Sequence, residues 1–212
     1  MNEIGIPLPT GRKSAFAARN REALVTSAIK TLARLGSQAS IDDFAKDADL
    51  AVSTIYKHFE NREQLVQAAI LAGMSDWESW MTEQLSTIED PLEALISPMR
   101  LIVKMRHTHP DYAQIALNTQ REFLNLIPSL TAQLRENILS LAKADLLPST
   151  DLEARVANLG ACLNSAFVTA NRESNPNQAA ALLQIRVALE LIGLTSDQAA
   201  ELMCRPLPSN LN

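Results

Sequence analysis

Apolar residues recur along this chain at the three- and four-residue spacing of one face of an α-helix. Near the N-terminus, Val25, Ile29, Leu32 and Leu35 form one such stripe, and Gly36 follows where a helix commonly ends. No stretch alternates apolar and polar residues between turn residues, as a half-buried strand would. The pattern therefore predicts an all-α protein.

Prolines and capping residues divide the chain into helices. Prolines are absent from Thr10 to Asp90, and each later one is expected at the entry of a helix, where its missing N–H costs nothing. These prolines are Pro91, Pro98, Pro110, Pro128, Pro148 and Pro176. The predicted helices span residues 17–35, 41–48, 52–58, 61–86, 91–107, 110–119, 128–145, 151–173, 176–193 and 196–203.

The second and third predicted helices are too short to be stable alone. Ser40 can cap the second helix and Asp43 can complete a capping box. Only a tight reversal around Asp49 separates it from the third. Two such helices must cross, with Phe44 and Ile55 facing inward and the first helix bracing them. This is the layout of a helix-turn-helix.

The outward side of the third helix carries groups that suit contact with DNA. They are Val52, Ser53, Thr54, Tyr56, Lys57 and His58. Hydroxyl groups and Lys can meet phosphates or base edges, and a Val or Thr methyl can meet a thymine methyl. The alternative is that Tyr56 packs on the first helix and Lys57 only lies in water.

The run SIDDFAKDADLAVSTIYKHFENREQLV, with TIYKHF at its centre, resembles the N-terminal domain of TetR-type transcriptional regulators over about residues 17–70. The resemblance implies an N-terminal helix-turn-helix DNA-binding domain plus a C-terminal helical domain for ligand binding and dimerisation. It also implies a homodimer that binds double-stranded operator DNA, most often as a repressor released by a small-molecule effector. We therefore expect a flexible basic arm at 1–16, the DNA-binding domain at 17–62 and the effector-binding domain at 63–212.

The resemblance extends to individual residues. It places Thr54, Tyr56, Lys57 and His58 at DNA-facing positions, and it adds Arg62 at the start of the fourth helix and Ser40 before the second. The fourth helix would touch DNA at its start and pack into the body beyond, so that a bound effector could shift the reading helices.

Two residues depart from the family pattern. Asp49 stands where the turn usually has Gly, and Asp can adopt the left-handed conformation more easily than most residues. Ala51 stands where Ser usually caps the recognition helix, a loss of about 0.5–2 kcal/mol. If Ser53 replaces that cap, the register of every DNA contact shifts.

Charge is distributed unevenly along the chain. Its net charge is −5, yet residues 1–35 carry six basic and two acidic residues. Such a basic terminus indicates contact with a polyanion. The segment TGRKSAFAARNR either enters a minor groove or acts only as a non-specific cationic tail.

The last long helices predict a subunit interface. Residues 179–194 are apolar on nearly all sides, so two faces of that helix need cover, and the preceding helix offers small residues for close approach. The predicted interface residues are Ala157, Gly160, Ala161, Val168, Leu182, Ile185 and Leu189. The alternative is that both helices are buried within a monomer.

A modest, largely aliphatic effector site is expected among the helices between residues 61 and 173. The candidate lining residues are Trp80, Met99, Met105, Asn118, Arg121, Phe123, Asn164 and Phe167. Arg121 could pair with a carboxylate ligand, or it could equally bridge the neighbours of Glu122 in solvent. The sequence gives no effector identity and no operator sequence.

Other classes of function have weaker support. His107, His109, Asp111 and Cys162 do not form a convincing catalytic or metal cluster, and Cys162 and Cys204 have no companions at metal-ligand spacing. We expect no cofactor, no catalytic residues and no bound metal, and a cytoplasmic protein without membrane spans. The predicted function is a repressor released from a palindromic operator; the alternatives are an effector-dependent activator, a thiol-based sensor or an all-helical enzyme.

Overall fold

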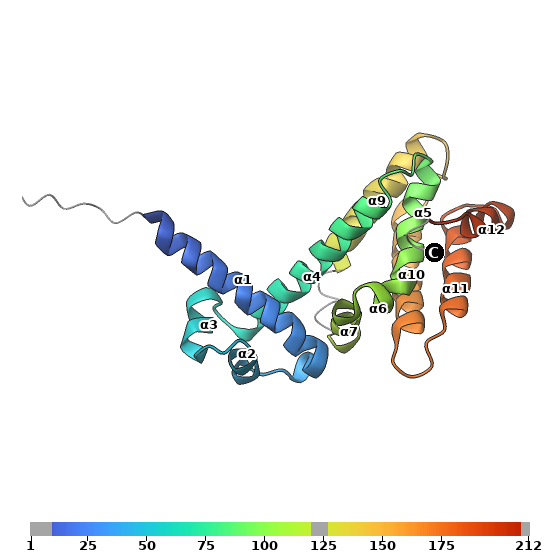
Figure 1. Cartoon of the computed structure of the whole chain (residues 1–212). Helices are drawn as coiled ribbons and strands as arrows, with labels where there is room; N and C mark the ends of the chain where they lie inside the picture. Colours follow the sequence, from blue (N-terminus) through green and yellow to red (C-terminus); the bar gives the residue numbers. More distant parts are fainter. Residues whose placement is uncertain (1–9, 120–126, 209–212) are drawn as a thin grey trace, which may run out of the picture.

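The computed structural model describes residues 10–119 and 127–208, and every regular element in these ranges is helical (Figure 1). The α-helices are α1 (Thr10–Leu35), α2 (Ile41–Asp47), α3 (Val52–His58), α4 (Arg62–Gln84), α5 (Pro91–Leu101), α6 (Met105–Thr108), α7 (Pro110–Asn118), α9 (Ile127–Lys143), α10 (Leu152–Asn171), α11 (Gln178–Leu191) and α12 (Ser196–Cys204). Short 3-10 helices, η1 (Gly36–Gln38) and η2 (Ile102–Lys104), follow α1 and α5. In the described ranges, no helix has the length and apolar character needed to cross a membrane.

The N-terminal module is built on the apolar stripe of α1. Leu24, Ala28 and Leu32 are fully buried there against α2, α3 and the first half of α4. Phe44 of α2 and Ile55 of α3 enter the same core. Burial of these side chains holds two helices that are individually too short to be stable.

A second core lies in the C-terminal body, where α10 and α11 pack closely along their lengths. Leu159, Ile185 and Leu189 are fully buried between them. Helices α5, α9 and α12 cover the remaining sides of this pair. Figure 1 shows the two modules at opposite ends, with α4 running from one to the other.

The body also reaches the N-terminal module through α7, which packs on α1. Asn118 Nδ2 donates a hydrogen bond to the Ala33 carbonyl at 3.1 Å. Gly36 has a φ of +56°, and a Cβ there would lie 2.7 Å from Cβ of Asn118. Glycine is therefore required here both by its conformation and by the close approach of α7.

Helix α1 begins at Thr10, earlier than the predicted start at residue 17, so residues 10–16 are helical rather than part of a flexible arm. The sequence from Arg12 to Leu35 contains no Pro or Gly and is rich in Ala and Arg, which favour a continuous helix. Residues 1–9 of the predicted arm lie outside the described ranges.

The prediction of a single helix at 91–107 is wrong, because the chain forms α5, η2 and α6 there. The side chain of Asn171 explains the break. Its Oδ1 accepts from the Arg106 N–H at 2.8 Å, and its Nδ2 donates to the Ile102 carbonyl at 2.9 Å. These two backbone groups would bond each other in a continuous α-helix, so the amide is inserted into the helical ladder.

Prolines mark some of the observed helix starts. Pro91 and Pro110 are the first residues of α5 and α7, as predicted. Pro98 instead lies inside α5, where its entry role was predicted wrongly, three residues before that helix gives way to η2.

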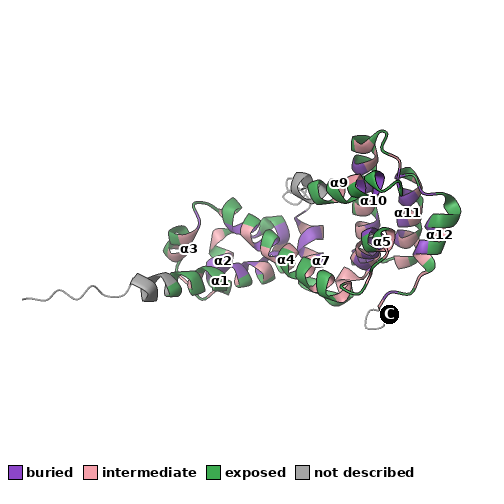
Figure 2. Cartoon of the chain, turned by 90° about the horizontal axis from the view of Figure 1, so that it is seen from above, coloured by how far each residue is buried: buried purple, intermediate pink, exposed green. Residues whose placement is uncertain are grey.

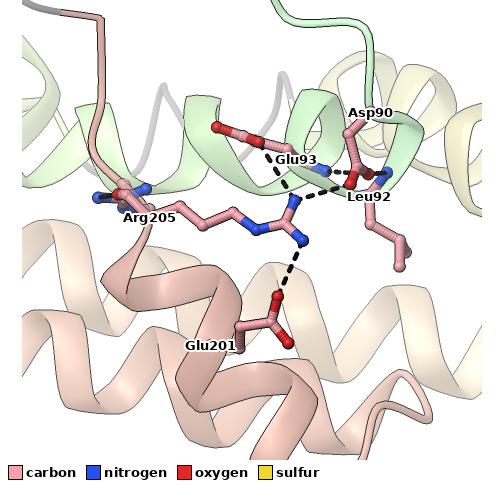
Figure 3. Close-up of polar contacts among 6 residues, drawn as sticks. Asp90, Leu92, Glu93, Glu201 and Arg205 are labelled. Carbon is pink, nitrogen blue, oxygen red and sulfur yellow. Dashed lines mark hydrogen bonds and ion pairs between the residues drawn. The ribbon is translucent and has the colours of Figure 1, made fainter.

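The end of α12 is fastened to the start of α5 by Arg205 (Figure 3). Its guanidinium contacts Asp90 at 2.7 Å, Glu93 at 3.3 Å and Glu201 at 3.1 Å. Asp90 also caps α5 by accepting from the Leu92 and Glu93 N–H groups. The hydrogen bond from Arg205 is the main cause that lowers the pKa of Asp90. This network closes the body at the end away from the N-terminal module.

Candidate nucleic-acid interface and ligand cavity

The turn between α2 and α3 is fixed by local hydrogen bonds. Ser40 and Asp43 form the predicted capping box, with the Asp43 N–H donating to Ser40 Oγ at 3.2 Å and the Ser40 N–H donating to Asp43 Oδ2 at 2.9 Å. Asp49 has a φ of +53°, and the Leu50 N–H then donates to the Ala45 carbonyl at 2.9 Å. Asp49 thus adopts the left-handed conformation that the sequence required of it.

Helix α3 has one buried and one exposed side (Figure 2). Ile55 and Phe59 are buried, whereas Tyr56 is 54% exposed. Ser53 and Lys57 are also exposed, and Val52, Thr54 and His58 are half-buried. No hydrogen bond or ion pair within the described chain occupies the side chains of Tyr56, Lys57 or His58, so all three have free polar groups beside one surface.

The start of α3 settles the register that the sequence left open. The helix begins at Val52, and Ala51 occupies the N-cap position with extended backbone angles and no capping hydrogen bond. Ser53 lies within the first turn and does not replace the cap. The exposed positions are consequently those of a helix running from Val52 to His58.

Two of the predicted DNA-contacting side chains already have partners in the free chain. Arg62 Nε donates to the Ala39 carbonyl at 2.6 Å, and its Nη2 donates to the Ser37 carbonyl at 2.8 Å. Ser40 Oγ is held in the capping box by Asp43. In this structure both residues therefore shape the loop before α2.

Helix α1 braces the helix-turn-helix at two points. Asp47, at the end of α2, accepts from the buried Thr31 hydroxyl at 2.8 Å and from Arg34 at 2.5 Å. Two hydrogen bonds lower the pKa of Asp47. The one from Thr31 has the largest effect, and the one from Arg34 has the second largest. The guanidinium of Arg21 lies over the Phe59 ring, 5.0 Å from its centroid, which fixes the end of α3.

A cavity of about 380 Å³ lies in the body between α4, α5, η2, α6, α7, α9 and α10. Four residues predicted to surround a ligand line it: Met99, Met105, Asn164 and Phe167. The volume falls within the range of small-molecule sites in proteins. Its lining is mostly aliphatic, methionine and aromatic, with a few amides at exposed positions.

Trp80 and Asn118, which were also predicted to surround a ligand, do not line this cavity. Trp80 lies against the His109 ring at a centroid distance of 5.0 Å. Asn118 is bonded to the Ala33 carbonyl and to Gln114, so it joins α7 to α1 instead. Arg121 and Phe123 lie outside the described residues.

Sequence reasoning missed several lining residues, among them Trp77 and Tyr112. Tyr112 packs directly on α4, where a Cβ at Gly73 would lie 2.6 Å from its ring. Gly73 within an otherwise regular helix was a signal of that close approach. Burial and the nearby Asp76 carboxylate raise the pKa of Tyr112.

His109 lies behind Tyr112, at the junction of α6 and α7. Its ring is stacked with that of Tyr112 at 5.8 Å, and its Nε2 is 3.9 Å from Asp76 Oδ2. Burial lowers the pKa of His109. His107 is exposed, and within the described ranges no three His, Cys, Asp or Glu side chains are grouped as a metal site.

The outer face of α11 differs from the predicted interface. Ile185 and Leu189, which were predicted as dimer-interface residues, are fully buried against α10 within the subunit, so their side chains do not face outward. Leu183, Val187 and Leu191 are exposed instead, at 55%, 45% and 45%, and their spacing of four residues forms one stripe. The side of α11 that faces away from α10 therefore carries an exposed apolar stripe.

The predicted interface residues of α10 and the remaining one of α11 stay at or near the surface. Ala157 and Ala161 are exposed, and Gly160, Val168 and Leu182 are half-buried. Gly160 also lines the cavity. The small side chains therefore leave the backbone of α10 accessible along one side.

Comparison with known proteins rests on structure. No protein-family model matches the chain, and no curated protein matches its sequence. The resorcinol complex of RolR matches with a TM-score of 0.73 and 20% identity, covering 94% of this chain and 100% of the RolR chain.

Two further solved structures resemble the chain. A TetR-family transcriptional regulator from Syntrophomonas wolfei matches with a TM-score of 0.68 and 13% identity, covering 84% of this chain and 97% of that one. The transcriptional regulator FadR from Bacillus subtilis, in complex with stearoyl-CoA, matches with a TM-score of 0.65 and 14% identity, covering 81% and 97%. The chain therefore has the fold of the TetR-family transcriptional regulators.

Proposed function

We propose that this protein is a transcriptional repressor that binds a palindromic operator as a homodimer and leaves it when a small molecule enters the cavity. The observation that carries the proposal is the course of α4. Asn61 caps α4 directly after the exposed helix α3, and residues from Ala69 to Met81 of the same helix line the cavity. One rigid element thus connects a DNA-reading surface with a ligand site.

Helix α3 is the proposed recognition helix. Ser53, Tyr56 and Lys57 are exposed on the surface that would enter the major groove, with Val52, Thr54 and His58 beside them. Arg62 and Ser40 are assigned a positioning role, because their polar groups hold the loop that supports α2. The basic first turns of α1 extend beyond this module and add attraction to phosphates.

The α10–α11 face is the proposed dimer interface. Pairing two subunits about a twofold axis would cover the stripe of Leu183, Val187 and Leu191, and small residues such as Ala157 and Ala161 would allow close helix approach. Two recognition helices would then read successive major grooves about 34–36 Å apart. Such a dimer would act on operator DNA in the cytoplasm.

A ligand regulates DNA binding if it favours one position of α4 over another. The solved complexes of RolR with resorcinol and of FadR with stearoyl-CoA hold small molecules in proteins of this fold. For this chain we propose the α4–α10 cavity as the effector site. A coupling free energy of about 1–3 kcal/mol would change operator affinity about 5- to 150-fold.

Selection of bound DNA from random duplexes tests the proposal. We expect recovery of a palindromic sequence whose half-sites lie about one helical turn apart. Placing that sequence in a promoter should lower transcription when the protein is present. Recovery of no common sequence would contradict operator binding, and a rise in transcription would identify an activator instead.

A further inference from the structure

The cavity shows which chemical class of effector this protein can hold, an inference that rests on the proposed ligand-released repressor. Its interior is built for apolar atoms. Four methionines, Met74, Met81, Met99 and Met105, come from α4, α5 and α6, and Ile70, Leu95 and Phe167 add aliphatic and aromatic walls. Methionine side chains adapt their shape at small energetic cost, so such walls fit an irregular apolar body.

The described part of the cavity lining offers no positive charge to a ligand. Among the lining residues that the structure describes, none is Lys, Arg or His. The lining contains one carboxylate, Glu78, which is exposed and has no partner in the described chain. A carboxylate or phosphate ligand would therefore be desolvated without a counter-ion and would meet a like charge, which is costly.

Uncharged hydrogen-bonding groups are present instead. Gln133 Nε2 donates to Asn137 Oδ1 at 2.9 Å, which leaves the Gln133 carbonyl oxygen as an acceptor and the Asn137 amide as a donor. Both residues and Asn164 are exposed, so these amides lie at the mouth of the cavity. Trp77, also in the lining, has a buried indole N–H without a partner.

From these observations we propose that the cavity binds an uncharged, largely apolar molecule whose few polar groups are hydroxyl, carbonyl or amide, and that it excludes carboxylates of the same skeleton. The apolar body occupies the methionine-lined interior, and an uncharged polar end meets the amides of α9 and α10. Organic acids belong to the excluded class because of their carboxylate. Acyl-CoA thioesters belong to it because their CoA part carries phosphates.

A matched set of probes tests the proposal by calorimetric titration of the full-length protein without DNA. The probes are 4-butylphenol, 4-butylbenzamide and 4-butylbenzoate, of which only the last is charged at pH 7.5. We expect the two neutral probes to bind with a Kd at least about ten-fold below that of the benzoate, a factor that corresponds to about 1.4 kcal/mol. Ala94→Trp, at an exposed lining position, should weaken the neutral probes because it blocks the cavity.

A charge introduced at the mouth provides the converse test. Gln133→Lys supplies a cation at an exposed position and should lower the ratio of the benzoate Kd to the phenol Kd about ten-fold. Arg121→Gln tests the residue that the sequence offered as a carboxylate partner. The proposal is overturned if the wild-type protein binds the benzoate as tightly as the benzamide, if it binds neither neutral probe, or if Arg121→Gln abolishes binding of the benzoate.

These measurements are separate from the test of repression because no DNA is present. If the neutral probes bind as predicted and do not change operator affinity, the ligand class stands and the release mechanism fails.

Discussion

At the start of α3, Ala51 has the backbone of an N-cap without the side chain of one. Its φ and ψ of −71° and 144° are the extended values that a capping Ser adopts, so a hydroxyl there would reach an unpaired N–H of the first turn. We predict that Ala51→Ser raises the free energy of unfolding by about 0.5–2 kcal/mol. Urea denaturation measures this, and Ser53→Ala, which removes a hydroxyl inside the turn, should change stability little. No gain from Ala51→Ser would mean that α3 begins at another residue.

Asp47 links α2 to α1, and we expect this contact to weaken in acid. Thr31 and Arg34 lower the pKa of Asp47 in the folded state from its ordinary value of 3.8. Its stabilisation is therefore fully present above about pH 4 and is lost as the pH falls through the folded pKa. Asp47→Asn should reduce stability at pH 7 and flatten the loss of stability below pH 4. Thermal melts across that range measure the slope; an unchanged slope would show that Asp47 contributes nothing to it.

Lys57 is predicted to bind a phosphate rather than a base. Lys57→Ala should weaken binding to specific and non-specific duplexes alike and reduce the slope of log affinity against log salt by about one. Lys143→Ala, an equal charge change at the exposed end of α9, is the control and should alter neither quantity. A changed base preference in the Lys57 variant would assign that residue to base readout.

At the scale of elements, the break between α5 and α6 depends on Asn171. Asn171→Leu would leave the Ile102 carbonyl and the Arg106 N–H without their buried partner, and each such loss costs about 1–3 kcal/mol. We therefore predict a destabilisation of roughly 2–6 kcal/mol in chemical denaturation. Asn158→Leu, at an exposed position of the same helix, should cost much less. Equal effects of the two variants would show that the inserted amide is not important for stability.

Local signals predicted most helix ends. The remaining helix ends depend on long-range contacts, which the local sequence does not display. Gly36, the Ser40–Asp43 capping box and Pro91 act within a few residues, so the sequence displayed them directly. The break at η2 depends on Asn171, which lies 65 residues away from Arg106, and no local pattern announces it. The unbroken run from Arg12 to Leu35 was readable as helix, and the early start of α1 could have been predicted.

The candidate sites show the same division. The exposed side of α3 followed from its short amphipathic pattern, because Ile55 and Phe59 leave little choice of face. Helix α11 is apolar on nearly all sides, so its sequence could not tell which residues face α10 and which face outward. Likewise, Trp77 and Trp80 are equally plausible cavity residues until the packing of His109 against Trp80 is known.

At the scale of the whole molecule, two cores are joined by α4 and by the contact of α7 with α1. The dimer we propose would bring two such molecules together through the α10–α11 face. Val187→Glu, in the centre of the exposed stripe, should convert the dimer to a monomer and reduce operator affinity by more than about ten-fold. Leu71→Glu, an exposed leucine on α4, is the matched control. Analytical ultracentrifugation measures the oligomeric state of both variants. A Val187→Glu protein that remains a dimer would contradict this interface.

Helix α3 is proposed to read a specific DNA sequence, and the ratio of specific to non-specific affinity measures this reading. Fluorescence anisotropy at one salt concentration gives this ratio for the selected palindrome and for a scrambled duplex of equal length. We predict a ratio of at least about 10³ for the wild-type protein. We also predict a large loss of that ratio in a Ser53→Ala, Tyr56→Ala double variant that still folds. Equal affinity of the wild-type protein for both duplexes, or an unchanged ratio in the double variant, would contradict sequence-specific reading by α3.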